Sequence, residues 1–301
     1  MIVEHLDLLF RTGGIKEKEG AAEAATERLL RTIGNKIHGE AFTREKGSMY
    51  PSDSGKCTRK VQYAYNAVPE EPSLPETSFK FMMGDLLELA VIYALKHCPG
   101  IRISGNNEKM EIDIDGKGHK GATDGIVQYK RKNAWSPKFN LEVKSMSRYG
   151  FQNTVKNGID NTWGYLTQAE VYMREQLKRG LIDKPGGTIF LLIDRDTMKF
   201  ADELVAYTGK YADEADARFK RVKEATAEKR MVTRDYLLKA DGTLDINCSY
   251  CGYKWGCWSE PHVMVSFNKK GEPVYPEGKK MRKVVERSIV RGRPVFAPVE
   301  V

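Results

Sequence analysis

The middle of the chain carries acidic residues and a lysine in an order that suggests chemistry. From Gly118 to Ser145 the sequence predicts two strands joined by a hairpin. On the second strand apolar and polar residues alternate, so the side chains of Glu142 and Lys144 share one face. Asp124 belongs to the first strand, and pairing across the turn at residues 130–137 would place it beside Glu142.

Two carboxylates that converge on one point repel each other unless a cation lies between them. Their hard oxygen ligands suit magnesium or manganese. A lysine beside such a site can hold a phosphate or orient a water molecule. On these residues alone the alternative stays open, namely an ordinary hairpin with a solvated aspartate, glutamate and lysine.

Two further segments carry candidate site residues on predicted helices. The stretch FKFMMGDLLELAVIYALKHC is apolar almost all round and predicts a buried helix. Its Glu88 is costly there unless it is paired, binds a metal or reaches solvent at the helix edge. On the later helix WGYLTQAEVYMREQL, Gln168 and Tyr172 are four residues apart and share a face, which alone is typical of a surface pair.

Three of the five cysteines lie close together in INCSYCGYKWGCWSEPH: Cys248, Cys251 and Cys257. Thiolates at this spacing can converge on one metal centre. The fourth ligand is open: His262 would complete a zinc site, whereas Cys57 would complete an all-cysteine site suited to an iron–sulfur cluster. Taken alone, Cys57 is more typical of a small buried apolar residue, and Cys98 is expected to be structural.

The remaining elements frame these residues. A helical pattern from Ile2 to His38, broken at Gly13-Gly14, predicts a packing arm, and Ser52, Asp53 or Ser54 is expected to cap the helix that carries Cys57. Further expected elements are strands at 101–104, 110–114 and 186–194 and two helices after Ser145. A long charged helix is expected from 202 to 230, with Gly209 as a candidate break, and the basic tail is expected to form a hairpin with a helix or an extended arm.

Length and charge are consistent with one large core that has additions. The chain has 301 residues and a formal net charge of +8, which fits a polyanionic partner such as DNA without requiring one. No apolar run reaches the roughly 20 residues of a membrane helix, and the first residues lack a signal-peptide layout. We therefore expect a cytoplasmic protein without membrane contact.

Taken together, the motifs resemble the PD-(D/E)XK nuclease superfamily, and within it the RecB-like exonucleases that carry an iron–sulfur cluster. Examples are the AddB nuclease domain and the CRISPR-associated RecB-like nucleases. The resemblance covers roughly residues 50 to 262 and rests on several motifs in family order: Cys57 with Arg59 and Tyr63, Gly84 with Glu88, Asp124, Glu142 to Lys144, Gln168 with Tyr172, and the three terminal cysteines. Two positions depart from the family pattern, because Glu88 stands where histidine is usual and Thr123 where proline is usual.

The resemblance implies a restriction-endonuclease-like α/β core, with a central mixed sheet flanked by helices, and a C-terminal cysteine-rich iron–sulfur module. The expected segments are a helical arm at 1–48, the nuclease core at 49–240 and the cluster module with its basic tail at 241–301. Magnesium or manganese ligands would be Glu88, Asp124, Glu142 and the carbonyl of Val143. Lys144 would orient the nucleophile or neutralise the transition state, while Gln168 and Tyr172 would position the substrate strand or Lys144.

The same resemblance implies that Cys57, Cys248, Cys251 and Cys257 bind a 4Fe-4S cluster with a stapling role. The expected activity is that of a Mg- or Mn-dependent deoxyribonuclease, an exonuclease that acts on single-stranded or end-containing DNA in recombination or repair. Because no GxxxxGK[ST] motif is present, a helicase or recombination protein is the expected partner for any unwinding. The alternatives are a non-catalytic zinc-containing DNA-binding protein and an inactive nuclease fold that acts in assembly.

Overall fold

The computed structural model describes residues 1–11, 26–27, 30–31, 33, 47–70, 75–106, 109–237, 244–258, 263–267, 273–274, 284–290 and 293–299. Most of the second half of the expected helical arm lies outside these ranges, as does His262. Contacts group the chain into two units. The first comprises residues 1–44, 49–55 and 74–219, and the second comprises residues 45–48, 56–73 and 220–301. The three expected segments, by contrast, follow the linear order of the chain.

A mixed sheet forms the centre of the first unit. Its strand order is β1-β4-β6-β7-β8, and β5 pairs with β4. Only β6 and β7 pair in parallel, and the other neighbours are antiparallel. The strands are β1 (Ile101–Ser104), β4 (Gly125–Arg131), β5 (Ala134–Trp135), β6 (Phe139–Met146), β7 (Thr188–Asp194) and β8 (Phe200–Val205).

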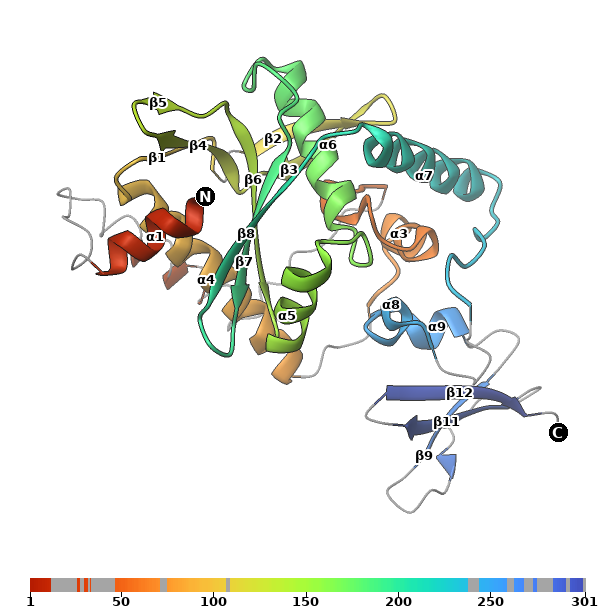
Figure 1. Cartoon of the computed structure of the whole chain (residues 1–301). Helices are drawn as coiled ribbons and strands as arrows, with labels where there is room; N and C mark the ends of the chain where they lie inside the picture. Colours follow the sequence, from red (N-terminus) through yellow and green to blue (C-terminus); the bar gives the residue numbers. More distant parts are fainter. Residues whose placement is uncertain are drawn as a thin grey trace. The chain divides into compact units, whose positions relative to one another are not determined.

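Helices cover both faces of this sheet (Figure 1). On one face α1 (Ile2–Arg11) and α4 (Pro75–His97) pack against Leu141, Val143 and Leu191 in one apolar core. On the other face α5 (Arg148–Asn157) and α6 (Tyr165–Lys178) pack against Phe190 and Leu192. Successive side chains of β6 and β7 therefore point to opposite faces of the sheet, where they meet two different groups of helices, as the two-residue period of a β-strand requires. The expected α/β architecture with a central mixed sheet flanked by helices is what the structure shows.

Two predicted elements differ in the structure. Residues 202–205, expected to begin the long helix, belong to β8, and Gly209 with φ of +80° precedes the helix α7 (Lys210–Ala227). The helix α4 was expected to be buried throughout, but Phe79 and Phe81 near its start are 59% and 62% exposed. Only its second half, from Val91 onward, packs continuously into the core.

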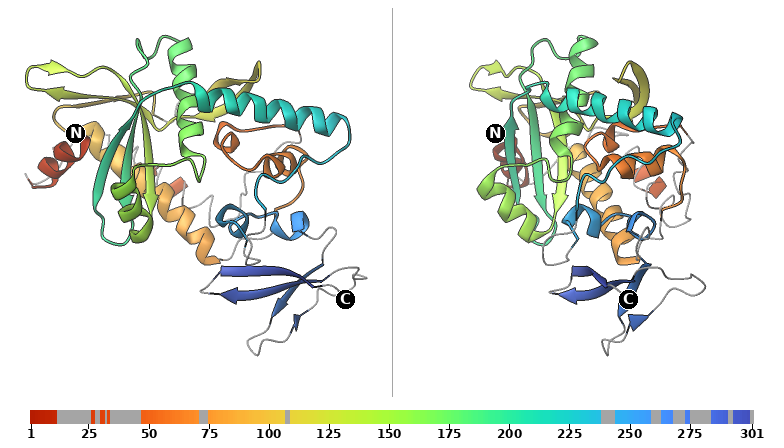
Figure 2. Two further views of the ribbon diagram at one scale, coloured as in Figure 1. Left: turned by 45° about the vertical axis from the view of Figure 1, so that its right-hand side comes forward. Right: turned by 90° about the vertical axis from the view of Figure 1, so that its right-hand side faces the viewer.

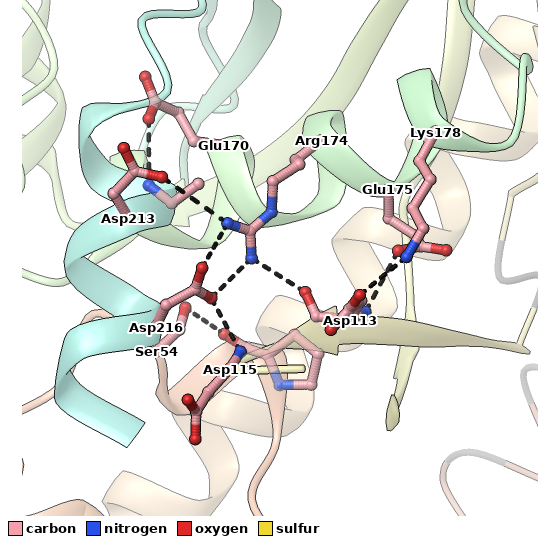
Figure 3. A network of polar contacts seen from close by, with 11 residues as sticks. Ser54, Asp113, Asp115, Glu170, Arg174, Glu175, Lys178, Asp213 and Asp216 are labelled. Atoms are coloured by element: carbon pink, nitrogen blue, oxygen red, sulfur yellow. Dashed lines mark hydrogen bonds and ion pairs between the residues drawn. The ribbon is translucent and has the colours of Figure 1, made fainter. Parts of the chain in front are cut away.

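A polar network ties α6 to its neighbours (Figure 3). Arg174 donates to both carboxylate oxygens of Asp216 on α7, at 2.8 Å each, and to the carbonyl of Asp113 at 2.9 Å. Asp113 lies on β2 (Lys109–Ile114), which pairs with β3 (Lys117–Ala122). Glu170 accepts hydrogen bonds from the backbone N–H groups of Thr208, Tyr211 and Ala212 around the start of α7. Several anchors thus fix α6, the helix that carries Gln168 and Tyr172.

The second unit contains α3 (Thr58–Tyr65), the short helices α8 (Ile246–Ser249) and α9 (Lys254–Trp258), and a four-stranded sheet in the order β10-β9-β11-β12 (Figure 2). The strands are β9 (Val263–Phe267), β10 (Pro273–Val274), β11 (Val284–Val290) and β12 (Arg293–Val299). The hairpin expected in the tail is present as the antiparallel pair of β11 and β12, and it belongs to a sheet, while the described residues of the tail form neither the expected helix nor an extended arm.

The expected cap of α3 is also wrong. Pro51–Asp53 form the short 3-10 helix η1, and Cys57 occupies the N-cap position of α3 without using its own side chain. Asp235 supplies the cap instead, because one of its carboxylate oxygens accepts from the Thr58 N–H at 2.7 Å and from its hydroxyl at 2.8 Å. Among the described helices, none is long and apolar enough to cross a membrane.

Candidate active site

Asp124 lies where two strands of the central sheet diverge. Strands β4 and β6 pair only from Gly125 to Val127, so β6 beyond Leu141 has no β4 residue opposite it. Asp124 takes that place, because its Oδ2 accepts the N–H of Val143 at 2.7 Å. In a strand the N–H and C=O of one residue point to the same edge. The Val143 carbonyl therefore faces the edge at which Asp124 lies.

Glu142 and Lys144 flank Val143 on strand β6. Their side chains lie on one face of the strand, and Val143 lies on the other face, in the apolar core. Glu142 is completely buried, and Lys144 Nζ donates to its Oε1. The other carboxylate oxygen, Oε2, is buried and has no hydrogen-bond partner among the described residues. A buried carboxylate oxygen without a partner is costly, and a cation is one group that can satisfy it.

Glu88 joins these acids from α4. The helix comes close to the end of β6 at Gly84, where an added Cβ would lie 3.1 Å from Ser145 Oγ. Burial first, and then the charges of Asp124 and Glu142, raise the pKa of the Glu88 carboxyl to about 8 against the opposing charge of Lys144. The three carboxyl groups therefore influence one another electrically, although they come from a helix, a turn and a strand.

The charge states at the site follow from burial and from this clustering. Burial raises the pKa of Glu142 to about 7 against the attraction of Lys144, with Asp124 adding to the rise. Burial also raises the pKa of Asp124, while Lys144 and the hydrogen bond from Val143 lower it. For Lys144, burial alone would lower the pKa, but the carboxylates of Glu142 and Asp124 outweigh it and raise the pKa. The lysine is thus held as an ammonium among acids that resist full ionisation.

Tyr172 lies beside this group. It is buried, and its pKa is raised by burial first and then by the charges of Glu142 and Asp124. A pair at four-residue spacing was read as typical of a surface, and Tyr172 departs from that reading. Gln168 is half-buried, and its side chain forms no hydrogen bond within the described part of the chain. The structure therefore brings Tyr172 to the acids and does not connect Gln168 to them.

Sequence reasoning missed Tyr165, the first residue of α6. Its ring lies 5.2 Å from Lys144 Nζ, within cation–π range. Tyr165 and Tyr172 are seven residues apart, which is two helical turns, so the helical period that joined Gln168 to Tyr172 also indicates Tyr165.

A second missed feature is a buried amide and hydroxyl network behind Asp124. Gln176 Nε2 donates to Asn140 Oδ1 at 2.9 Å and to Thr123 Oγ1 at 3.2 Å. Asn140 Nδ2 donates to Thr188 Oγ1 at 3.1 Å, and the Gly125 N–H donates to Thr123 Oγ1 at 3.2 Å. Thr123 thereby fixes the turn that carries Asp124. The polar Asn140 within the β6 alternation was the available signal.

In the present arrangement, no three His, Cys, Asp or Glu side chains of the described residues are placed so that they could hold a metal ion. At the acidic site, Lys144 Nζ donates a hydrogen bond to Oε1 of Glu142, so that oxygen already has a partner. The donor set nevertheless fits a hard divalent cation. Asp124 and Glu142 raise the pKa of Glu88, and Asp124 raises that of Glu142. One buried oxygen of Glu142 lacks a partner among the described residues, and the Val143 carbonyl faces the edge at which Asp124 lies.

The second unit gathers four cysteines, none of which forms a disulfide. Burial and the charges of Cys57, Cys251 and Cys257 together raise the pKa of Cys248 to about 12, which places all four in one neighbourhood. The N–H of Tyr253 donates to Cys251 Sγ at 3.5 Å. Soft sulfur donors are the ligands that zinc and iron–sulfur clusters prefer, although no three of the described cysteines are placed so that they could hold one metal ion in the present arrangement.

Cys98 lies apart, as expected, buried in the core of the first unit. Its thiol donates to the carbonyl of His5 at 3.1 Å. The alternative zinc ligand His262 lies outside the described residues.

No family model matches the sequence, and no curated protein matches it. Among the solved structures that are similar to the chain are the following two, both at low scores. A protein called SSO0001 is 18% identical over 76% of this chain and 93% of its own, with a TM-score of 0.42. An alkaline exonuclease from Laribacter hongkongensis is 14% identical over 64% of this chain and 97% of its own, with a TM-score of 0.40. Neither similarity assigns a family or an activity to this chain.

Proposed function

We propose that the protein is a Mg- or Mn-dependent DNA nuclease that hydrolyses phosphodiester bonds. One observation carries the proposal: the half-buried Glu88 and Asp124 and the buried Glu142 form an acidic group around Lys144, at the point where β4 and β6 diverge. The order of these residues along the chain resembles that of the PD-(D/E)XK nucleases. By that resemblance we further propose an exonuclease that acts on single-stranded or end-containing DNA, with a helicase or recombination protein as its partner.

Glu88, Asp124, Glu142 and the Val143 carbonyl would hold the cation. When bound, a divalent cation offsets the negative charge that develops on the scissile phosphate and lowers the pKa of a water ligand. Lys144 keeps its proton, because the neighbouring carboxylates raise its pKa. Its ammonium can therefore donate hydrogen bonds to an anionic phosphate oxygen. The Tyr165 ring restricts where that ammonium lies, and Tyr172 packs beside the acids.

We propose separately that Cys57, Cys248, Cys251 and Cys257 hold a 4Fe-4S cluster with a structural role. Support comes from the four sulfurs that share one neighbourhood and from two N–H groups directed at sulfur: the Tyr253 amide to Cys251 and the Trp258 side chain to Cys248. Hydrogen bonds to the sulfurs are a common feature of such centres. Zinc bound with His262 in place of Cys57 is the competing assignment.

The decisive assay measures cleavage of end-labelled single- and double-stranded DNA by the parent and by Asp124→Ala, Glu142→Ala and Lys144→Ala, with Mg, with Mn and with excess chelator. We expect cleavage only with metal, and a loss of at least about a hundredfold in turnover for each variant, because each removes transition-state stabilisation. DNA binding should persist in all three. Cleavage in excess chelator, or variants as active as the parent, would overturn the assignment.

A non-catalytic zinc-containing DNA-binding protein is the second candidate. The same cysteine group and the net charge of +8 favour it. It makes the opposite prediction in the same assay, namely DNA binding without cleavage under any metal condition. It also predicts stoichiometric zinc in the purified protein.

A further inference from the structure

A positively charged hairpin lies at the far end of the strand that follows Asp124. Strand β4 runs from Gly125, next to Asp124, to Arg131, and a two-residue turn then leads into β5. We call residues 130–135 together with Arg102 of the neighbouring β1 the basic hairpin. Its cationic side chains are Arg102, Lys130, Arg131 and Lys132, and all four are exposed.

Among the residues that the structure describes, these four cations have no partner of the kind that neutralises other basic residues of the unit. Arg174 pairs with Asp216, Lys178 with Asp113, and Arg179 with Glu175. Within the described ranges, by contrast, none of the four side chains of the basic hairpin forms an ion pair with a carboxylate. Their charges are therefore available to an external anion.

The two arginines are held in place by aromatic rings. The Arg102 guanidinium lies 3.8 Å from the centre of the Trp135 ring, and that of Arg131 lies 5.4 Å from the centre of the Tyr129 ring. A guanidinium that stacks on a ring keeps its N–H edge free for a phosphate and loses less side-chain freedom when it binds one.

The hairpin also borders an open hollow of about 640 Å³. Its lining contains one carboxylate against three cations, and its residues are Glu4, His5, Leu8, Lys130, Arg131 and Lys132. At the turn, Lys132 adopts φ of +49°, a left-handed conformation that favours glycine or asparagine. A lysine at this position adds charge to the turn despite the conformational cost.

We propose that the basic hairpin binds the phosphodiester backbone of a nucleic acid strand whose scissile bond lies at the acidic site. This inference rests on the proposed function and adds a location for substrate binding. Six residue steps along β4 span about 20 Å. A strand with the duplex rise of about 3.4 Å per nucleotide needs about six nucleotides to cover that distance. The contribution of the hairpin should therefore appear only with substrates longer than about six nucleotides.

The test uses the full-length protein with Asp124→Ala, in buffer without divalent metal, so that binding is measured without cleavage. Fluorescence anisotropy gives the dissociation constants of labelled single strands of 4 to 30 nucleotides. The variant Lys130→Glu/Lys132→Glu is compared with Lys156→Glu/Lys184→Glu, which changes the net charge equally at two exposed sites elsewhere. For the 30-nucleotide strand we expect the hairpin variant to bind at least about tenfold more weakly, and the control to change less than about twofold.

Length and salt separate a binding site from general charge attraction. The hairpin variant should bind a 4-nucleotide strand as the parent does, and its slope of log affinity against log salt should be shallower by about 1.4, for two lost phosphate contacts. Equal losses for the hairpin variant and the control, equal losses at all lengths, or equal displacement of the strand by polyglutamate would each overturn the proposal.

A second pair of variants guards against misfolding. Lys132→Gly and Lys229→Gly each remove one charge at a residue with positive φ, +49° and +54° respectively, so neither should destabilise the fold. Only Lys132→Gly should weaken binding of the long strand, by about two- to threefold. If the parent binds long strands through the hairpin but never cleaves with any metal, the nuclease proposal fails, and with it the scissile bond at the acidic site, while strand binding by the hairpin stands.

Discussion

Glu88 is the residue whose ionisation depends most clearly on its neighbours. Its carboxyl lies on a helix surrounded by apolar residues, and burial together with Asp124 and Glu142 raises its pKa to about 8. In the unfolded chain the carboxyl has the ordinary pKa of about 4.3. Between these two values the folded protein binds more protons than the unfolded protein, so stability must fall as the pH rises through this range.

The first prediction concerns this linkage in Mg- and Mn-free buffer. The free energy of unfolding of the parent should decrease from pH 5 to pH 8, and Glu88→Gln, which has no proton to lose, should show a slope smaller by up to about 1 kcal/mol per pH unit. Urea unfolding followed by circular dichroism at several pH values measures both slopes. Identical slopes would show that Glu88 reaches solvent and is not part of the acidic group.

The second prediction compares two glutamines of α6. Gln176 holds Asn140 and Thr123 in a buried network, whereas the Gln168 side chain forms no hydrogen bond among the described residues. Gln176→Leu should lower the free energy of unfolding by about 2 kcal/mol, because it leaves buried polar partners unsatisfied, and Gln168→Leu should change it by less than about 0.5 kcal/mol.

Urea titration of the two glutamine variants tests this difference. If Gln168 positions the substrate strand, Gln168→Leu should lose turnover while it keeps its stability. Similar stability losses in both variants would contradict the separation of a structural from a positioning glutamine.

At single residues the sequence predicted a good part of the site. The alternation along β6 placed Glu142 and Lys144 on one face, as the structure shows. Strand pairing was expected to bring Asp124 beside Glu142, and in the structure the Asp124 carboxylate accepts the N–H of the adjacent Val143. Burial could not be predicted in the same way, because the polar face of an alternating strand usually meets solvent. Here α6 covers that face, so Glu142 and Asn140 are both completely buried. The alternation of apolar and polar residues along a single strand does not predict which helix packs on its polar face.

Among elements, α6 matters most because both tyrosines of the site lie on it. The third prediction concerns the anchor of this helix through Arg174, whose fork binds both oxygens of Asp216 and the carbonyl of Asp113. Arg174→Ala should lower the free energy of unfolding by about 1 to 2 kcal/mol, as expected for a partly exposed bidentate pair. Arg174→Lys should recover only a small part, because an ammonium cannot form the fork.

Thermal unfolding of the two Arg174 variants gives the order of stability. A Lys variant as stable as the parent would show that charge alone, without the bidentate geometry, supplies the anchor. Asp213→Ala is a suitable control, because its carboxylate lies 4.0 Å from Arg174 and is largely exposed, so it should cost little.

The periodicity of apolar residues predicted most helices and strands correctly. It failed where contacts with residues far away in the sequence determine the secondary structure or the burial. Strands β1, β2 and β7 and helices α5 and α6 follow their expected positions. Residues 202–205 read as helix because charged residues surround them, yet pairing with β7 makes them a strand. Similarly, the apolar start of α4 predicted burial, whereas Phe79 and Phe81 are exposed in the structure. Local propensity is a weak prior when pairing or packing partners are far away in the sequence.

The whole chain divides in a way that no linear reading could supply. Residues 56–73, including Cys57, group with the cysteine-rich region 220–301, while residues 49–55 group with the acidic site. Cysteine chemistry alone left the fourth ligand open between Cys57 and His262, and only the resemblance to the iron–sulfur nucleases implied Cys57. Contacts inside the second unit support the upstream choice: Asp235 caps α3 next to Cys57, and Tyr63 stacks on Tyr253 with ring centres 5.2 Å apart.

The fourth prediction follows from this long-range association. A cluster on Cys57, Cys248, Cys251 and Cys257 would close a loop that contains most of the chain, and closure of such a loop is worth up to about 5 kcal/mol. Anaerobically purified parent should be brown and contain iron and sulfide. Cys57→Ser should lose the colour and unfold at lower denaturant concentration, whereas Cys98→Ser, the matched control in the other unit, should keep the full cluster.

The variant His262→Ala distinguishes an iron–sulfur cluster from zinc: it should stay coloured if iron and sulfur are bound. Colourless protein with stoichiometric zinc that tolerates Cys57→Ser but not His262→Ala would overturn the cluster. It would leave the acidic site around Asp124 to its own assays, since that site uses none of these sulfurs.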